Sequence, residues 1–539
     1  MTSPLAKNFP MKSNPSFPNH HPGQSRREAV SVSQVLLPAR RAAAAATFLL
    51  SALAVTGCLP GPKYQKPSAP ASTAPAYKES TANFQDAPGW KVANPQDAML
   101  KGKWWEIYNQ PELNALEEQL QINNQNIKVS FENFMAARAL IREAKAQYWP
   151  TITTSPGWSR NKTSGNLGRS ATANAGSTTS TWSFPFDVSW TPDFFGKIRS
   201  QVREDEYAAQ VSAADLENEK LVEEASLAEY YFELHGQDAL QKILDDTVAA
   251  DKKALDLTQT LYDTGVDQYI SVVGAQATLK TAESAALNLG VARAQYEHAI
   301  AMLIGKPATD FSAEVKPLLV APPPIPVGVP SQLLQRRPDI AAAERTLAEA
   351  NATIGIGYGA FFPDVTLSAS GGFEASAFQH WFDWPSRFWS IGPSLSQTIF
   401  NGGLYRAALN QYTAIYNGDV ATYRESVLTA FQQVEDYLAA IRILSEQEIK
   451  QREAVDAEAA YLKLEMGRYE TGIDPYIDVM TAQTTLLGDQ QTLASLQIQE
   501  SVASVELIQA LGGGWDVSQL PTPAQVAAKP AKGDYVLQK

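Results

Sequence analysis

The chain of 539 residues contains an internal duplication, and this repeat constrains its fold more than any other feature. Residues 262–279 (YDTGVDQYISVVGAQATL) align without gaps with residues 469–486 (YETGIDPYIDVMTAQTTL), and eleven of the 18 positions are identical at an offset of 207. Tyr148-Trp149-Pro150 similarly corresponds to Phe361-Phe362-Pro363. A repeat of this kind indicates one structural unit used twice. We therefore expect each half to contain a helix, a pair of strands and two long helices.

The duplication divides the chain into two repeats and the segments around them. The first repeat is expected at 103–305, with a strand pair at about 150–192 and long helices at 196–263 and 266–305. The second is expected at 336–513, with a strand pair at about 363–400 and long helices at 403–471 and 474–511. Residues 306–335 form a Pro-rich linker between the repeats, and residues 514–539 form a C-terminal tail.

The second repeat opens with Arg336-Arg337-Pro338-Asp339-Ile340. Pro338 suits the first turn of a helix, where its missing N–H is not needed, and Asp339 complements the positive end of the helix dipole. We expect the two arginines to be an exposed structural feature rather than an anion site.

The N-terminus has the pattern of a lipoprotein signal peptide. Arg40-Arg41 precede an apolar run of about 13 residues, which is too short to span a bilayer as a helix. The run ends in Val55-Thr56-Gly57-Cys58, which resembles the site where bacterial lipoproteins are cleaved before a lipidated cysteine. We therefore expect residues 1–57 to be a signal peptide, Cys58 to carry lipid and residues 58–102 to be a lipid-anchored extended segment. The alternative is a plain signal peptide with an incidental cysteine.

Short segments in both halves alternate between apolar and polar residues. Trp182, Phe184, Phe186, Val188 and Trp190 alternate with polar neighbours, and the segments around Val365 and Trp389 do the same. Transmembrane barrel strands show this alternation and carry aromatic residues at both interfaces. A half-buried soluble sheet is the alternative, but the Ser-, Thr-, Gly- and Asn-rich stretch 159–180 favours an extracellular loop.

Four strands cannot close a barrel, because the smallest spanning barrels need about eight. An open sheet edge in lipid would leave backbone groups unpaired. Copies of the chain must therefore pool their strands, and three copies would supply about twelve.

The predicted helices are far longer than those of ordinary globular domains. Residues 196–263 contain no proline, only Gly236 interrupts the run after its first residue, and it would extend about 100 Å as a helix. Leu438, Ile441 and Leu444 recur at coiled-coil spacing in the second copy. A plain coiled-coil rod is the alternative, but it would not explain the strand pairs.

Composition excludes several classes of function. The formal net charge of −13 argues against nucleic-acid binding, which needs a basic surface. One cysteine excludes a disulfide framework, and histidines after position 57 are only His235, His298 and His380. We therefore expect no enzyme activity, no metal site and no cofactor.

The layout resembles the TolC-like outer membrane factor family, in its lipoprotein (NodT-type) branch of efflux channels, over nearly all of the chain after Cys58. The resemblance rests on Trp104-Trp105, Pro60-Gly61-Pro62-Lys63-Tyr64, the Arg336–Ile340 motif, Ile354-Gly355, Phe361-Phe362-Pro363, Leu511-Gly512-Gly513 and the paired Tyr-x-Thr-Gly turns. It implies a mixed α and β membrane protein, in which a duplicated unit supplies four transmembrane strands and very long periplasmic helices. It also implies a homotrimer with a twelve-stranded barrel in the bacterial outer membrane and an α-helical tunnel in the periplasm. The implied partners are a periplasmic adaptor, an inner-membrane resistance-nodulation-division pump and outer membrane lipid.

The family further implies a gate beside the Tyr-x-Thr-Gly turns, which face the periplasmic end of the tunnel. Gly265 and Gly472 can take the positive φ that ends a helix. The gate candidates are Asp474, Ile477, Asp478, Tyr469, Tyr476, Tyr262 and Asp267. Three-fold symmetry would make Asp478 a ring of carboxylates that attracts cations; the alternative is that these are solvated acids of a turn. Thr481 and Ser271 stand where family members often carry acids.

The expected function is therefore a passive export duct for drugs and other toxic small molecules. A conduit for type I protein secretion is an alternative within the same class. A structural periplasmic coiled-coil lipoprotein is an alternative of another class.

Overall fold

In the computed structural model, the described residues are 61–69, 77–79, 102–166, 176–319, 321–325 and 332–529. All of them belong to the compact unit Cys58–Lys539. The expected signal peptide and lipidation site, residues 1–57 and Cys58, lie outside the described residues.

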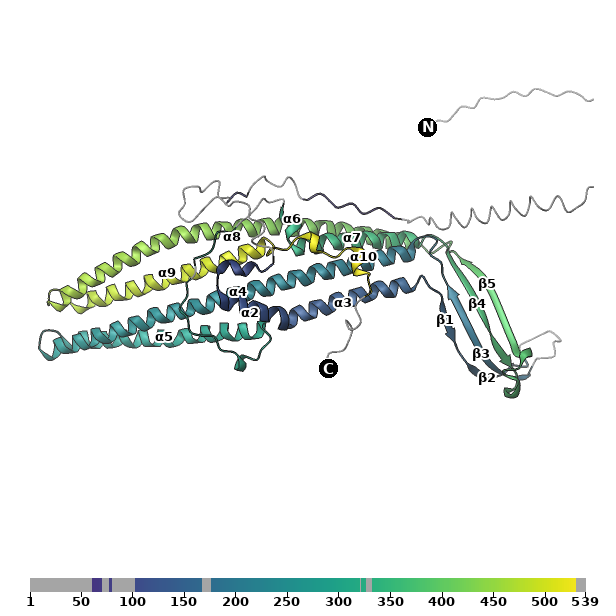
Figure 1. Ribbon diagram of the computed structural model, residues 1–539, viewed down its shortest axis with the longest axis horizontal. Helices are drawn as coiled ribbons and strands as arrows, with labels where there is room; N and C mark the ends of the chain where they lie inside the picture. The colour runs from purple at the N-terminus through teal and green to yellow at the C-terminus, as the bar shows by residue number, and fades with distance from the viewer. Residues whose placement is uncertain are drawn as a thin grey trace, which may run out of the picture. The chain divides into compact units, whose positions relative to one another are not determined.

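Long helices dominate the unit, and those of the two repeats match in length (Figure 1). In the first repeat they are α3 (Gln125–Ala146), α4 (Lys197–Asp263) and α5 (Tyr269–Leu303). In the second they are α7 (Pro338–Gly359), α8 (Leu404–Glu470) and α9 (Tyr476–Ala510). The equivalent helices have 22, 67 and 35 residues in both repeats. At 1.5 Å per residue, α4 and α8 each extend about 100 Å.

Short elements precede, connect or follow the long helices and the strands along the chain. They are the 3₁₀ turn η2 (Trp104–Tyr108), α2 (Pro111–Asn123), η3 (Ala308–Asp310), α6 (Leu333–Arg336), η5 (Phe378–His380), η6 (Trp384–Ser386), η7 (Val517–Gln519) and α10 (Pro523–Val526). The side chains of Trp104 and Trp105 in η2 are 0% and 1% exposed, and they contribute to the largest apolar core together with α2, α4, α5 and α9.

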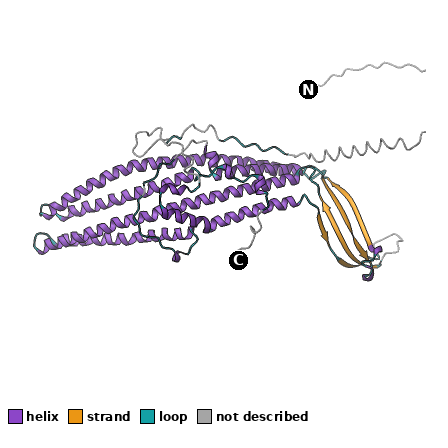
Figure 2. Cartoon of the chain, viewed as in Figure 1, coloured by secondary structure: helices purple, strands orange, loops and turns teal. Residues whose placement is uncertain are grey.

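The strands form one antiparallel sheet at one end of the helices (Figure 2). The strands are β1 (Thr151–Thr154), β2 (Gly157–Lys162), β3 (Thr178–Trp190), β4 (Asp364–Ala375) and β5 (Arg387–Ser396). β1 and β2 pair with β3 in one continuous register, so they are two parts of a single strand interrupted at Ser155-Pro156. The sheet therefore has four strand positions, in the order β1/β2, β3, β4, β5.

Proline explains the interruption of the first strand. Pro156 has no N–H to donate, and the register places Ser155 opposite Pro185, which also lacks one. The hydroxyl of Thr154 donates to the carbonyl oxygen of Pro185 at 2.8 Å. The predicted loop 159–180 was too long, because strand pairing continues to Lys162 and begins again at Thr178. Ser and Thr are compatible with a solvated strand, so composition alone placed the boundary wrongly.

The register separates the sheet into an apolar and a polar face. Residues that are directly paired share a face, so Ile152, Val188, Ala369 and Ile391 form one row across all four strand positions. The other members of this apolar face include Phe186, Trp190, Leu367, Trp389 and Leu395. The opposite face is mainly Thr, Ser, Gly and Asp, for example Thr153, Asp187, Ser370 and Ser390.

Side chains on the apolar face are widely exposed in the single chain. Ile152, Trp389, Ile391 and Leu395 are 67%, 80%, 76% and 69% exposed. Among the described residues, β1/β2 pairs only with β3 and β5 pairs only with β4, so each lateral edge of the sheet is unpaired. Among the described residues, no helix combines the length and apolar character needed to cross a bilayer.

Arg337 differs from the expectation that it is exposed. Its side chain is buried, and its guanidinium donates to Ala510 O at 2.9 Å, Gln433 Oε1 at 2.8 Å and both carboxylate oxygens of Asp339. It thereby satisfies a carbonyl at the C-terminal end of α9, where the helix dipole favours a cation. The sequence could not reveal this, because Ala510 becomes its neighbour only through folding.

Candidate functional site

The helices α4 and α5, and likewise α8 and α9, form hairpins whose turns lie at the end away from the sheet (Figure 1). We call the residues around these turns, 258–271 and 465–483, the helical tip. Gly265 and Gly472 have φ values of 78° and 73°, so both adopt the left-handed conformation that glycine tolerates without a Cβ clash. Their N–H groups donate to Tyr262 O and Tyr469 O, each at 2.9 Å. The two turns therefore close in the same way.

A hydrogen bond joins the two hairpins at the tip. The hydroxyl of Tyr469, at the end of α8, donates to Asp267 Oδ2 in the first turn at 2.7 Å. The other oxygen of Asp267 accepts from the Ser271 hydroxyl at 2.9 Å and from the N–H of Gln268 at 2.6 Å. Burial acts to raise the pKa of Asp267, but these hydrogen bonds favour the carboxylate and lower the pKa overall.

The equivalent aspartate in the second turn has a different partner. Arg468 forms an ion pair with Asp474 through two guanidinium nitrogens, and its Nη2 donates to Asp474 Oδ1 at 2.9 Å. This hydrogen bond and the charge of the guanidinium lower the pKa of Asp474. Arg468 was not among the expected site residues. The repeat alignment contained the signal, because Leu261 occupies the equivalent position in the first repeat.

Two of the expected tyrosines are buried between the hairpins. Tyr469 and Tyr476 are 4% and 3% exposed, their rings lie 5.3 Å apart, and they pack with Ala254, Ala275 and Val479. Burial raises the pKa of both hydroxyl groups to about 12. These tyrosines hold the two hairpins of one chain together.

The other expected residues lie on the surface of the tip. Ile477 and Tyr262 are 52% and 40% exposed, and Tyr262 packs against Tyr269 with ring centroids 5.5 Å apart. Asp478 is half-buried in the first turn of α9. The structure thus brings Asp267, Tyr469 and Tyr476 together, and it places Ile477 and Tyr262 outside that group. The Thr481 hydroxyl donates to Ile477 O at 2.8 Å, which is an ordinary contact within a helix.

A second polar contact between the hairpins was not expected from the sequence. Gln483 of α9 donates to Asp251 Oδ1 of α4, and Asp251 is 1% exposed. Burial raises the pKa of Asp251 to about 6, although the hydrogen bond from Gln483 acts in the opposite direction. Asp251 and Gln483 lie 232 residues apart in the chain, so local pattern could not pair them.

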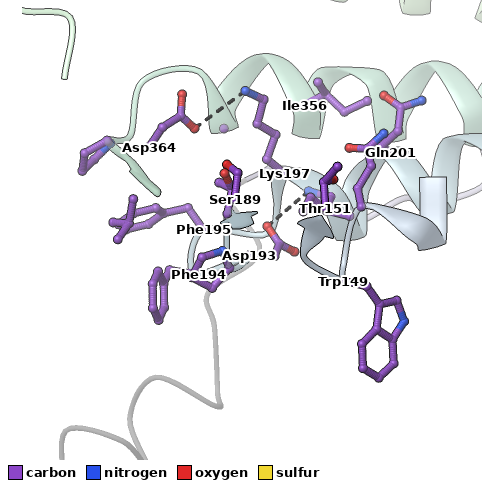
Figure 3. A pocket seen from close by; sticks show the side chains of 17 residues that line it. Trp149, Thr151, Ser189, Asp193, Phe194, Phe195, Lys197, Gln201, Ile356 and Asp364 are labelled. Carbon is purple, nitrogen blue, oxygen red and sulfur yellow. Dashed lines mark hydrogen bonds and ion pairs between the residues drawn. The ribbon is translucent and has the colours of Figure 1, made fainter. Parts of the chain in front are cut away.

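A cavity of 360 Å³ lies at the other end of the helices, where they meet the sheet (Figure 3). Its wall includes Trp149, Asp193, Phe194 and Phe195, and Lys197 forms an ion pair with Asp364 at 3.8 Å. Asp193 accepts from the N–H groups of Ile198 and Arg199 at 3.1 and 3.0 Å, so it caps the start of α4. These contacts connect the helices to the strands. No group of three or more candidate metal-ligating side chains occurs in the part of the chain that the structure describes.

Comparisons with known proteins identify this arrangement. Residues 116–306 and 329–513 match the sequence profile of the family described as "Outer membrane efflux protein". The chain is 31% identical over 500 residues to the probable efflux pump outer membrane protein TtgC of Pseudomonas putida, covering 90% of this chain and 100% of that protein. It is 29% identical to the outer membrane protein OprJ of Pseudomonas aeruginosa, covering 88% of this chain and 97% of that protein.

Solved structures share the fold. The outer-membrane channel OprN superposes with a TM-score of 0.77 and 27% identity, covering 85% of this chain and 100% of that chain. The Campylobacter jejuni CmeC channel superposes with a TM-score of 0.76 at 21% identity, covering 86% of this chain and 96% of that chain.

These findings confirm the expected fold class, with its duplicated strands and very long helices, and the resemblance stated above. They also confirm an efflux channel of the outer membrane over a protein-secretion conduit or a structural coiled coil. The chain belongs to the outer membrane efflux protein family.

Proposed function

We propose that three copies of this chain form a passive export duct, with a twelve-stranded barrel in the outer membrane and a helical tunnel in the periplasm. The main support for a barrel comes from the sheet. Its apolar face is exposed, its opposite face is polar, and both lateral edges are unpaired among the described residues. Closing the sheets of several copies into a ring would pair every edge, as a hydrocarbon environment requires. The apolar face would contact lipid and the polar face would line water.

The helical tip is the proposed gate at the periplasmic end. In the closed state, the Tyr469–Asp267 hydrogen bond holds the ends of the two hairpins together, and the Arg468–Asp474 ion pair fixes the turn of the second hairpin. Asp474 lies in the turn before α9 and Asp478 in the first turn of α9, so symmetry would arrange them as two rings of carboxylates. Such rings attract cations at a constriction.

The duct works with two partners that supply recognition and energy. A periplasmic adaptor joins the tip to an inner-membrane resistance-nodulation-division pump, and the pump selects the cargo. Relatives from Pseudomonas putida are named as a toluene efflux pump protein and an antibiotic efflux pump protein. We therefore propose that the cargo consists of toxic small molecules, and that this chain changes no covalent bond in them.

The segment after Cys58 supports a lipid anchor. Gly61 packs so closely on α7 that a Cβ there would lie 2.8 Å from Gly355 Cα, and Asn351 donates to Pro62 O at 3.1 Å. Gly355 lies four residues before α7 ends at the sheet side. Three residues span at most about 11 Å, so Cys58 would lie near the periplasmic boundary of the proposed barrel.

Two further described parts of this segment, around Tyr64 and at residues 77–79, contact the long helices. The hydroxyl of Tyr64 donates to Glu344 Oε1 at 2.6 Å, and the N–H of Lys78 donates to Glu435 Oε1 at 2.7 Å. Tyr77 is 4% exposed among apolar residues of α8 and α9. These contacts would hold the anchor in place along the outside of the tunnel.

Single-channel recording in planar bilayers tests the duct. The purified protein should form trimers in detergent and long-lived conducting pores in a bilayer. Monomers in detergent, or trimers that never conduct, would rule out the export duct.

Substitution at the tip tests the gate. Asp474→Ala with Asp478→Ala should raise the conductance of the closed channel and reduce its block by multivalent cations. The matched control is Asp263→Ala with Glu470→Ala, which removes two exposed acids at the same end of the hairpins. If both pairs of substitutions have the same effect, the constriction lies elsewhere.

Replacement of the cysteine tests the anchor. Cys58→Ser should abolish the incorporation of radioactive palmitate while leaving the pores intact. Continued labelling of the variant would refute lipidation at Cys58.

A further inference from the structure

Three cationic side chains lie on the apolar face of the sheet, at the end away from the helices. The register places Arg160 and Lys162 of β2 on the same face as Trp158, and Arg387 of β5 opposite Phe373 of that face. All three cations are exposed. No acidic residue occupies this face within the paired segments, since Asp187, Asp364 and Glu374 belong to the polar face.

An aromatic cluster borders Arg160 and Lys162 on the side toward the helices, and it adjoins Arg387, whose partner Phe373 belongs to the cluster. Trp182 packs against Trp158, Phe378 and Trp381 with ring centroids 5.7, 5.0 and 5.3 Å apart. Phe382 stacks on Trp381 and contacts both Phe184 and Phe373. Residues 378–382 of the β4–β5 connection therefore fold over the apolar face.

The aromatic cluster marks a membrane interface. Phe378, Phe382 and Trp384 remain 64%, 60% and 74% exposed although they adjoin this packed cluster. Trp and other aromatic side chains gather where hydrocarbon meets headgroups, and the exposed patch continues the apolar face described above. Arg160 and Lys162 lie immediately beyond this belt, at the level of the headgroups, and Arg387 lies within the belt.

Ring closure would bring the three cations to the same seam. Within one sheet, β2 and β5 are separated by three strand spacings, about 14 Å. At a closed seam, β5 of one copy and the β1/β2 strand of the next would be adjacent, about 4.8 Å apart. β5 starts and β2 ends at the end away from the helices, so Arg387 of one copy and Arg160 and Lys162 of the next would share one end and one face.

Arg387 is already oriented by its own chain. Its Nε donates to Trp384 O at 2.9 Å, and its guanidinium lies over the Trp384 ring. The terminal guanidinium nitrogens can therefore meet an anion without giving up this bond. Guanidinium groups bind phosphate with two parallel hydrogen bonds, and an ammonium adds a point charge.

We propose that each seam between copies binds the phosphorylated headgroup of a glycolipid from the outer leaflet, giving three lipid sites per trimer. The proposal rests on the trimeric barrel proposed above. The acyl chains would lie on the apolar face below the aromatic cluster, and the phosphate would neutralise cations that otherwise repel one another. The lipid would then bridge two copies.

Native mass spectrometry of the delipidated full-length trimer tests the site. The probe is diphosphorylated lipid A, compared with the same lipid after removal of both phosphates. The trimer should retain up to three phosphorylated lipids and bind the dephosphorylated form at least tenfold more weakly. Arg160→Gln, Lys162→Gln and Arg387→Gln combined should weaken binding by a similar factor.

A matched control changes the same number of charges elsewhere. Lys128, Lys252 and Lys253 are exposed cations on α3 and α4, and their combined replacement by Gln should leave binding unchanged. Equal retention of the two lipid forms by the wild-type trimer, or equal losses in both triple variants, would overturn the proposal. Displacement of the lipid by millimolar inorganic phosphate would also overturn it, since the site would then recognise free phosphate.

The wild-type comparison keeps the test decisive if the triple variant fails to assemble. Failure of the wild-type chain to form a trimer would refute the export duct itself. A conducting trimer that binds the phosphorylated and dephosphorylated lipids equally well would refute only the lipid site.

Discussion

Tyr469 and Arg468 are adjacent in the chain but bind aspartates in different turns. Tyr469 crosses to Asp267 in the other hairpin, whereas Arg468 pairs with Asp474 in its own turn. Asp267 and Asp474 occupy equivalent positions of the repeat. Each repeat therefore carries the same aspartate, but only the second repeat has an arginine, Arg468, that forms an ion pair with it. Of these two bonds, the Tyr469 bond is the one that connects the hairpins at their turns, so it is the one expected to control the separation of the turns.

Removal of the Tyr469 hydroxyl should loosen the tip without emptying the space between the helices. Tyr469→Phe removes a hydrogen bond to a carboxylate, which contributes about 1 kcal/mol where water can reach the group. The closed channel should therefore open more often, by about fivefold for each independent contact. Single-channel recording measures the open probability. Tyr262→Phe is the matched control, because Tyr262 is the equivalent tyrosine of the first repeat, and an equal effect there would contradict the assignment.

Acid should open the tip within a defined pH range. The pKa values of Asp267 and Asp474 are lowered, so their bonds stabilise the closed tip fully above about pH 3.9, the pKa of a free aspartate. That stabilisation is lost as the pH falls through the lowered values. Asp251 affects stability in the opposite direction. Because burial raises its pKa to about 6, its contribution to the stability of the folded state increases as the pH falls and the carboxylate becomes protonated. Conductance recorded from pH 7 downward should stay low until about pH 4 and then rise. A rise complete by pH 5 would contradict the role of these aspartates.

At the scale of the elements, Gly236 explains how a helix of 67 residues packs against its neighbour. It lies in α4 without a positive φ, and a Cβ there would lie 2.5 Å from both Cγ1 and Cδ1 of Ile498 in α9. Glycine costs a helix about 1 kcal/mol relative to alanine. At this position it allows α9 of the other repeat to approach closely. Gly236, which interrupts the helical pattern of the sequence, thus allows close packing between helices of the two repeats.

Gly236→Ala should lower the apparent melting temperature in detergent, because the overpacking costs about 1–3 kcal/mol. Ile498→Ala alone should also destabilise the protein by leaving a cavity. The double variant should lose less stability than the sum of the two, since each change relieves the other.

Gly418→Ala in α8 is the control, because a Cβ there meets nothing within 4 Å. It should be neutral or slightly stabilising. Additive losses in the double variant would mean that Gly236 and Ile498 do not interact in the way described.

At the scale of the whole molecule, the sheet cannot be complete in one chain. Ile391 and Ser390 are adjacent in β5, yet their partners Ala369 and Ser370 assign them to opposite faces. Ile391 is 76% exposed, so the apolar face requires either lipid or another protein surface. The proposed barrel places lipid against it.

Lysine substitutions should distinguish the two faces. Ile391→Lys places a charge in the hydrocarbon and should cost about 2–4 kcal/mol of folding into a bilayer. Ser390→Lys places the same charge toward water, and its cost should be below about 1 kcal/mol. Urea titration of folding into lipid vesicles measures both. Equal losses would show that the two faces are not solvated differently.

Much of the fold could be predicted because it depends on short-range pattern. The period of two in Trp182–Trp190, the absence of proline from Lys197–Asp263 and the repeated Tyr-x-Thr-Gly turns each constrain the backbone within a few residues. These features predicted the strand pairs, the long helices and the turns, and the strand alternation predicted an apolar and a polar face. The sequence also implied that one copy has too few strands to close a barrel.

The remaining features depend on packing between segments far apart in the chain. Tyr469 and Asp267 are 202 residues apart, and Arg337 and Ala510 are 173 apart. The alignment of the hairpins places Tyr469 beside Asp267, while α9 brings a helix end to Arg337 and so buries an arginine expected to be exposed. The register of β2 and β5 likewise places Arg160, Lys162 and Arg387 on the apolar face. Local periodicity specifies which elements form, but only the packed helices and the paired strands determine which side chains meet.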